Sequence, residues 1–109
     1  MKIHQLFPLG VMQDQLTVSD EERAALIKSV EAMQGASNPS HQRFAWTGDV
    51  NGNEYLFNDP LWANVAQQVS QKVIQYLEAL SINTDLLELY FQRSWATLTK
   101  AEQNIAMHS

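Results

Sequence analysis

The feature that most constrains the fold is a long amphipathic pattern that begins at Asp59-Pro60. A carboxylate just before a helix caps its free N–H groups, and a proline in the first turn needs no N–H partner. Apolar side chains then recur at the spacing of one helical face over roughly five turns, at Leu61, Val65, Val69, Val73, Tyr76, Leu77 and Leu80. Ser81-Ile82-Asn83-Thr84 ends the pattern. The sequence therefore predicts a helix from Asp59 to about Leu80.

A second helix is predicted earlier in the chain. Ser19-Asp20-Glu21-Glu22 fits a capping box, in which Ser19 caps the helix and Glu22 reaches back to it. Gly35 supplies a stop. Apolar residues between them follow one helical face, at Leu26, Ile27, Val30 and Met33. We expect the two helices to bury a shared set of side chains between layers: Leu26, Ile27, Val30, Val65, Val69, Val73 and Leu77.

The remaining apolar segments read as strands. Residues 3–18 predict one or two opening strands that are interrupted at Pro8, which cannot donate to a ladder. Residues 44–47 and 54–57 predict a hairpin, because Asn51-Gly52 suits a tight turn between them. The aromatic and β-branched residues within 86–98 predict a long strand, and residues 104–108 begin another.

The order of these elements predicts a single α+β domain over residues 1–109, with both helices on one side of a sheet. The formal charge of -5 and seven scattered basic residues argue against nucleic acid as a partner. The absence of cysteine excludes a disulfide framework and a thiol nucleophile. No segment has the apolar length of a signal peptide or a membrane span, so we expect no membrane partner and a cytoplasmic location.

Local chemistry alone identifies no catalytic residue. His4 and His41 have no partner at ligand spacing and are interpreted as surface or hydrogen-bonded histidines. Residues 49–53 begin like a calcium loop, but Glu54 stands where glycine is required and Pro60 where the bidentate acid is required. We therefore interpret residues 49–53 as a turn.

The order of several short motifs carries more information than any single residue. Leu6-Phe7-Pro8 opens the chain, Leu61-Trp62 and Tyr76-Leu77 lie in the second helix, and Ser94-Trp95-Ala96-Thr97 is followed by His108. In this order the whole chain resembles a small bacterial and phage group of 2-oxoglutarate- and iron(II)-dependent oxygenases. That group opens with an L-F-P strand, continues through two helices to a strand reading roughly S-W-A-N, and then presents a metal-binding H-x-H or H-x-D.

This resemblance implies an incomplete double-stranded β-helix (jelly-roll) sheet supported by the two helices. It also implies that His108 is the first metal ligand of a facial triad. The second ligand, the distal histidine and the arginine for 2-oxoglutarate have no counterpart in the 109 residues, so the cofactor-binding residues are unknown. We therefore expect the N-terminal portion of a longer dioxygenase of unknown substrate, truncated at the first ligand and inactive alone. Iron(II) and 2-oxoglutarate belong to the full-length parent, and no cofactor is expected in this chain.

A second hypothesis belongs to another functional class. The chain could be a complete small α+β interaction domain without enzymatic activity, whose second helix offers a surface to a partner. In the isolated fragment, the strand that should lie beside the final strand is missing, which would leave an unpaired sheet edge near residues 105–108. Unpaired edges recruit other chains, so we expect a homo-oligomer through this edge.

Overall fold

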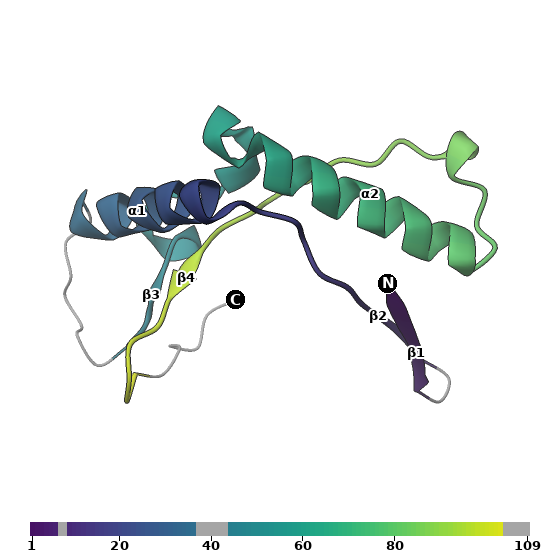
Figure 1. Ribbon diagram of the computed structural model, residues 1–109, viewed down its shortest axis with the longest axis horizontal. Helices are drawn as coiled ribbons and strands as arrows, with labels where there is room; N and C mark the ends of the chain where they lie inside the picture. Colours follow the sequence, from purple (N-terminus) through teal and green to yellow (C-terminus); the bar gives the residue numbers. More distant parts are fainter. Residues whose placement is uncertain (7–8, 37–43, 104–109) are drawn as a thin grey trace.

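A computed structural model describes residues 1–6, 9–36 and 44–103 of the chain. It has an α+β fold with two α-helices and two small antiparallel sheets (Figure 1), which confirms the predicted fold class. The elements are β1 (Lys2–Leu6), β2 (Leu9–Gln13), α1 (Asp20–Ala36), β3 (Trp46–Thr47), α2 (Ala63–Ala79) and β4 (Thr97–Leu98). In the described part of the chain, no helix is both long enough and apolar enough to cross a bilayer.

The first helix begins where the sequence predicts, at Asp20, whereas the α-helical part of the second begins at Ala63, four residues after the predicted start at Asp59. The Ser19 hydroxyl oxygen accepts a hydrogen bond from the Glu22 N–H at 3.1 Å, which supplies the predicted cap of α1. The Asp59 carboxylate accepts from the Leu61 N–H at 3.0 Å. It caps a 3₁₀ turn, Pro60–Trp62, that leads directly into α2. The caps predicted at Ser19 and Asp59 are therefore confirmed, but the Glu22 carboxylate accepts hydrogen bonds from the Asn64 side chain instead of the predicted one from Ser19. Gly35 lies in the last turn of α1, one residue before its end.

The two sheets lie at opposite ends of the molecule (Figure 1). Strands β1 and β2 form a hairpin in which Lys2 pairs with Gln13 and Leu6 with Leu9, as expected for the opening strands. Strand β3 pairs antiparallel with β4, from the far end of the sequence. The helices therefore do not lie on one side of a common sheet, and that prediction is wrong.

The predicted hairpin between residues 44–47 and 54–57 is also wrong. The Asn51-Gly52 pair does make a turn, and Gly52 has a φ of 79°, in the left-handed region that favours glycine. However, the N–H groups of Asn51 and Asn53 both donate to the Gly48 carbonyl, which closes a compact loop instead of starting a ladder.

The predicted long strand over residues 86–98 is mostly absent. Only Thr97–Leu98 belongs to a strand, and Thr84–Leu86 forms a 3₁₀ turn. A single parallel bridge between Tyr55 and Ser94 is the other strand-like contact in this region of the described chain. The strand expected at residues 104–108, and its edge, lie outside the described residues.

The apolar core lies at the end of the molecule that contains α1, β3 and β4 (Figure 1). Its buried hydrophobic residues are Leu26, Val30, Ala45, Trp46, Leu56 and Val65. Burial of Leu26, Val30 and Val65 was predicted and is confirmed, while Val69 and Leu77 are half-buried. The prediction is wrong for Ile27 and Val73, which are 47% and 36% exposed. No continuous sheet covers their sides of the helices.

The opposite end is held by polar side chains of α2 that recur every four residues and therefore lie along one face. We call them, with their partners, the polar ladder. Its members on α2 are Asn64, Gln68, Lys72 and Tyr76. Each contacts the N-terminal segment, with partners at Glu22, Thr17, Asp14 and Gly10. Residues 10–22 thus run antiparallel along α2.

The shortest hydrogen bonds of the polar ladder involve the backbone of the N-terminal segment. The Gln68 side-chain amide accepts from the Thr17 N–H at 2.8 Å and donates to the Thr17 carbonyl at 2.7 Å. The Tyr76 hydroxyl donates to the Gly10 carbonyl at 2.7 Å. A Cβ at Gly10 would lie 2.9 Å from that hydroxyl oxygen, so the close approach depends on glycine.

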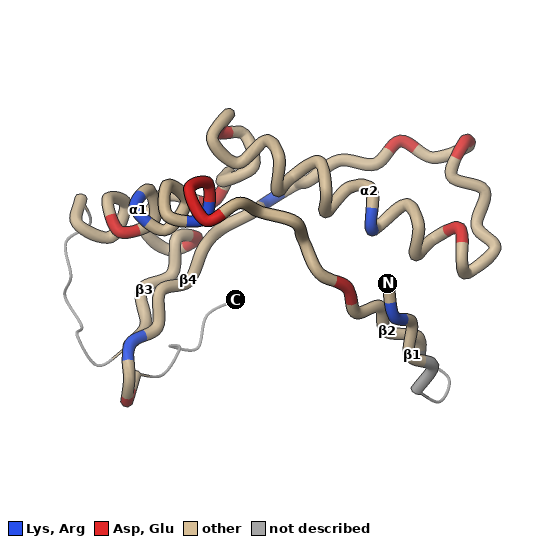
Figure 2. The backbone as a smooth tube through the Cα atoms, in the orientation of Figure 1, with Lys and Arg blue, Asp and Glu red and all other residues tan. Residues whose placement is uncertain are grey.

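One ion pair completes the polar ladder. The Lys72 ammonium lies 3.0 Å from the Asp14 carboxylate, and the N-terminal ammonium lies 3.4 Å from it. A hydrogen bond from the Gln15 backbone N–H, together with Lys72, lowers the pKa of Asp14 to about 2. Elsewhere, acidic residues gather on the first turn of α1, where they favour a helix N-terminus, and basic residues are scattered along the described chain (Figure 2).

Candidate functional site at Trp95

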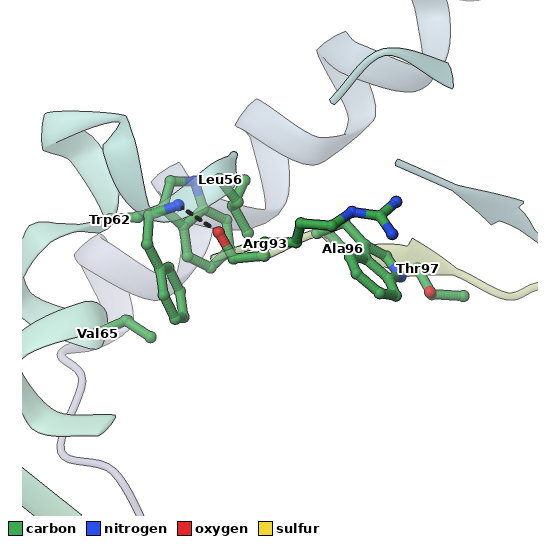
Figure 3. A pocket seen from close by; sticks show the side chains of 9 residues that line it. Leu56, Trp62, Val65, Arg93, Ala96 and Thr97 are labelled. Carbon is green, nitrogen blue, oxygen red and sulfur yellow. Dashed lines mark hydrogen bonds between the residues drawn. The ribbon is translucent and has the colours of Figure 1, made fainter. Parts of the chain in front are cut away.

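A cavity of about 590 Å³ opens where the chain leading into β4 passes the start of α2. We call it the Trp95 pocket (Figure 3). Its lining residues are Leu56, Phe57, Trp62, Val65, Arg93, Ser94, Trp95, Ala96 and Thr97. In Figure 3, Trp62 and Val65 form the helical side of the pocket, and Arg93, Ala96 and Thr97 lie on the strand side. Val65, which lines the pocket, belongs to the apolar helical face that the sequence predicts for α2.

Ser94 fixes the strand side of the Trp95 pocket through three hydrogen bonds. Its N–H donates to the Glu54 carbonyl, and its carbonyl accepts from the Leu56 N–H, both at 2.9 Å. Its hydroxyl oxygen accepts from the Phe57 N–H at 2.9 Å (dashed line in Figure 3). The N–H groups of Leu56 and Phe57 thus donate to Ser94 and are not available to the predicted hairpin with residues 44–47.

Gly48 lies next to two residues that line the Trp95 pocket, Ala96 and Trp95. Its N–H donates to the Ala96 carbonyl at 2.9 Å, which extends the pairing of β3 with β4. A Cβ at this position would lie 2.7 Å from the Asn53 carbonyl oxygen and 3.3 Å from the Trp95 Cβ. Because the Asn53 oxygen belongs to the backbone, a side chain at Gly48 would displace the loop of residues 48–53 and would also press on Trp95.

Arg93 brings the only formal charge among the lining residues of the Trp95 pocket. Its Nη2 lies 2.8 Å from the Glu54 Oε2, and its Cζ lies 5.1 Å from the centroid of the Trp95 ring. The guanidinium thus has both an anionic partner and an aromatic face. Phe57 and Phe91 extend the aromatic surface with an edge-on contact at 4.8 Å and 74°.

The lining of the Trp95 pocket is mostly apolar and aromatic. None of its lining residues is a histidine, cysteine or carboxylate that could serve as a nucleophile or general base. Apolar and aromatic walls with a few fixed polar groups are typical of sites that hold an apolar group. The polar side chains that line the pocket in the described part of the chain are those of Arg93, Ser94, Thr97 and the two tryptophans.

The predicted metal ligand, His108, lies outside the described residues, as does His41. His4 is exposed, and its Nε2 donates to the Gln13 Oε1 at 3.2 Å, which confirms its interpretation as a hydrogen-bonded surface residue. In residues 1–6, 9–36 and 44–103, no three side chains among His, Cys, Asp and Glu are grouped so that they could hold a metal ion. The described residues thus do not by themselves form an iron site.

Sequence reasoning identified Trp95 through the resemblance but missed Arg93, Glu54 and Gly48. The spacing of Arg93 and Trp95 offered a signal, because residues i and i+2 share a face of an extended chain. No local pattern pointed to Glu54 or Gly48. Comparison of the chain with protein-family models, curated proteins and solved structures gave no match.

Proposed function

We propose that this chain forms the N-terminal part of a 2-oxoglutarate- and iron(II)-dependent oxygenase domain with a double-stranded β-helix fold. The order of motifs from Leu6-Phe7-Pro8 to His108 supports the proposal. One structural observation carries it furthest. Residues 94–97, which match the S-W-A-N strand of that group, join the β3–β4 pair, residues 54–57 and the start of α2 around a single pocket.

In this proposal, the described residues act as support. The helices and the Trp95 pocket hold β4 in place, and the chain reaches His108 ten residues after Leu98, the last residue of β4. His108 would then be one of several protein ligands, since selective retention of a first-row metal needs more than one imidazole. Iron and 2-oxoglutarate would supply the oxidising chemistry, and the protein would supply ligands and positioning.

The test uses a longer polypeptide that includes the sequence encoded after codon 109. We expect it to retain iron(II) in a 2-oxoglutarate-dependent manner and to form succinate. His108→Ala in that polypeptide should abolish both properties. His4→Ala is the matched control, because His4 is exposed and bonded to Gln13, and it should leave both unchanged. Unchanged succinate formation in the His108→Ala variant would show that His108 is not a ligand.

The second candidate is a complete small α+β interaction domain without enzymatic activity. Large apolar side chains exposed at both ends of the second helical region favour it, since Leu61 is 42% and Leu80 is 46% exposed. The nucleotide sequence after codon 109 separates the two candidates. A stop codon supports the interaction domain, whereas an open frame with histidine or aspartate two residues after His108 supports the oxygenase.

A further inference from the structure

The Trp95 pocket combines an apolar interior with a charged rim. Leu56 and Val65, which line it, are 7% and 9% exposed, whereas Trp95 is 39% exposed and the Arg93 side chain is 42% exposed. In Figure 3, Val65 and the Arg93 guanidinium lie on opposite sides of the lining side chains. The volume of about 590 Å³ lies within the ~300–1,000 Å³ range of sites for small molecules. A ligand that spans the pocket would therefore meet apolar groups at one end and a cation at the other.

The walls of the Trp95 pocket favour an aromatic ligand over an aliphatic one. Phe57, Trp62 and Trp95 all present rings to it. The Trp62 ring is oriented by its indole N–H, which donates to the Ser29 hydroxyl at 3.4 Å, and Phe57 packs edge-on against Phe91. Aromatic rings attract one another more than their buried area alone accounts for. Rings held in this way offer fixed faces and edges to a planar ligand.

Arg93 indicates that the ligand carries an anionic group. Its guanidinium lies 2.8 Å from the Glu54 carboxylate, and Glu54 is not among the lining residues, so the pocket itself presents the cation. A guanidinium has five N–H donors, and one carboxylate accepts from two of them when it binds side by side. The other donors can bind a second carboxylate. The Ser94 hydroxyl, which accepts from the Phe57 N–H, still carries its own proton to donate.

We propose that the Trp95 pocket binds a planar aromatic carboxylate, with its rings against Trp62 and Trp95 and its carboxylate at Arg93. The guanidinium would repel a cationic ligand. A neutral aromatic ligand would not use the donors of Arg93, and an aliphatic dicarboxylate such as 2-oxoglutarate would leave the aromatic walls uncovered. The proposal does not depend on the oxygenase assignment, because every residue that it uses lies in the described part of the chain.

The first test compares two probes of the same shape by isothermal titration calorimetry of the 109-residue chain. We expect 2-naphthoate to bind at least tenfold more tightly than its uncharged analogue 2-naphthamide, because Arg93 pairs with the carboxylate. Arg93→Gln should remove this preference and leave the binding of 2-naphthamide unchanged. Lys100→Gln is the control, because Lys100 is an exposed cation outside the pocket lining, and it should keep the preference.

Several results of this test would overturn the proposal. One is equal affinity of the wild type for the two probes, or no saturable binding of 2-naphthoate. Another is an Arg93→Gln variant that keeps the preference or loses both probes, since loss of both would mean that Arg93 only maintains the pocket. Loss of the preference in Lys100→Gln would point to the overall charge of the chain instead. Displacement of 2-naphthoate by an equal concentration of 2-oxoglutarate, which has no ring, would also count against an aromatic site.

The second test locates the probe by NMR. The chain has three tryptophans, and the variants Trp46→Phe, Trp62→Phe and Trp95→Phe assign their indole N–H signals. Titration with 2-naphthoate should shift the signals of Trp62 and Trp95, which line the pocket. The signal of Trp46 should stay in place, since Trp46 is 9% exposed in the core and does not line the pocket. A shift of Trp46 as large as the other two, or an unshifted Trp95, would contradict the proposed site.

Discussion

The two ends of the molecule are held by different forces. At one end, α1, β3 and the start of α2 bury six apolar side chains around Trp46 and Leu56. At the other end, the β1–β2 hairpin is attached to α2 by the hydrogen bonds and ion pair of the polar ladder. A single helix, α2, thus makes an apolar contact at its first turn and presents a polar face along its length. The two attachments should therefore fail under different perturbations.

The largest expected effect is at the apolar end. Leu56 is 7% exposed, and Leu56→Ala should lower the free energy of unfolding by about 2–5 kcal/mol, because it removes buried methyl groups and leaves a cavity. Ile27→Ala is the control, since Ile27 is 47% exposed, and it should cost about 0.5 kcal/mol or less. Urea unfolding of the two variants measures both values. Equal losses would mean that Ile27 packs as a core residue.

A smaller effect is expected at the polar end. Gln68→Ala removes two hydrogen bonds to the backbone of Thr17 and should cost roughly 1–2 kcal/mol. Gln67, its exposed neighbour on α2, provides the control Gln67→Ala. Hydrogen exchange should show faster exchange of the β1–β2 amides in the Gln68 variant and unchanged exchange at Trp46. Faster exchange at both ends would mean that the two attachments are one cooperative unit.

Tyr76→Phe tests a single contact of the polar ladder. It removes the 2.7 Å hydrogen bond to the Gly10 carbonyl and keeps the ring, so about 0.5–1.5 kcal/mol should be lost. Gly10→Ala should act in the same direction, because its Cβ would lie 2.9 Å from the Tyr76 hydroxyl oxygen and displace it. Combining the two substitutions in one chain should cost less than the sum of their separate effects, since both disrupt the same contact. Full additivity, measured by urea unfolding, would contradict this shared contact.

The smallest effect is a dependence on pH. The pKa of Asp14 is lowered to about 2 by the Gln15 N–H and Lys72, below the ~3.9 of an unfolded aspartate. The carboxylate therefore stabilises the folded chain above about pH 4, and this contribution disappears as the pH falls from about 4 to 2. The difference in stability between wild type and Asp14→Asn should be present at pH 6 and absent near pH 2. NMR titration of Asp14 near its ordinary pKa would contradict this account.

The helices were predictable because their signals are local. The caps at Ser19 and Asp59 lie within three residues of the N–H groups that they accept from. The strands were not predictable in this way, because strand pairing depends on residues that are far apart in the sequence. Residues 86–98 have strand composition, yet only Thr97–Leu98 finds a partner strand in the described chain. Residues 87–93 have the same composition but form no ladder with described residues, and the chain bends at Gln92.

The candidate site was predictable only in part, for a related reason. Trp95 was singled out by the motif Ser94-Trp95-Ala96-Thr97, while the contacts of Ser94 with residues 54–57 depend on chain segments 37 residues apart. The polar ladder was missed because Asn64 and Gln68 read as ordinary solvent-facing residues of an amphipathic helix. His108, the residue on which the oxygenase proposal most depends, lies outside the described residues, and its role stays a prediction.

The polar ladder also has a consequence for the order of folding. Its contacts join residues that are 42, 51 and 66 positions apart, from Glu22–Asn64 through Thr17–Gln68 to Gly10–Tyr76. The loops are nested, so closing the shortest one leaves only a few additional residues to be ordered for each later contact. The contacts of the N-terminal segment with α2 should therefore form one after another, from Glu22 toward Gly10. The β1–β2 hairpin would dock last during folding and detach first whenever the native chain opens locally.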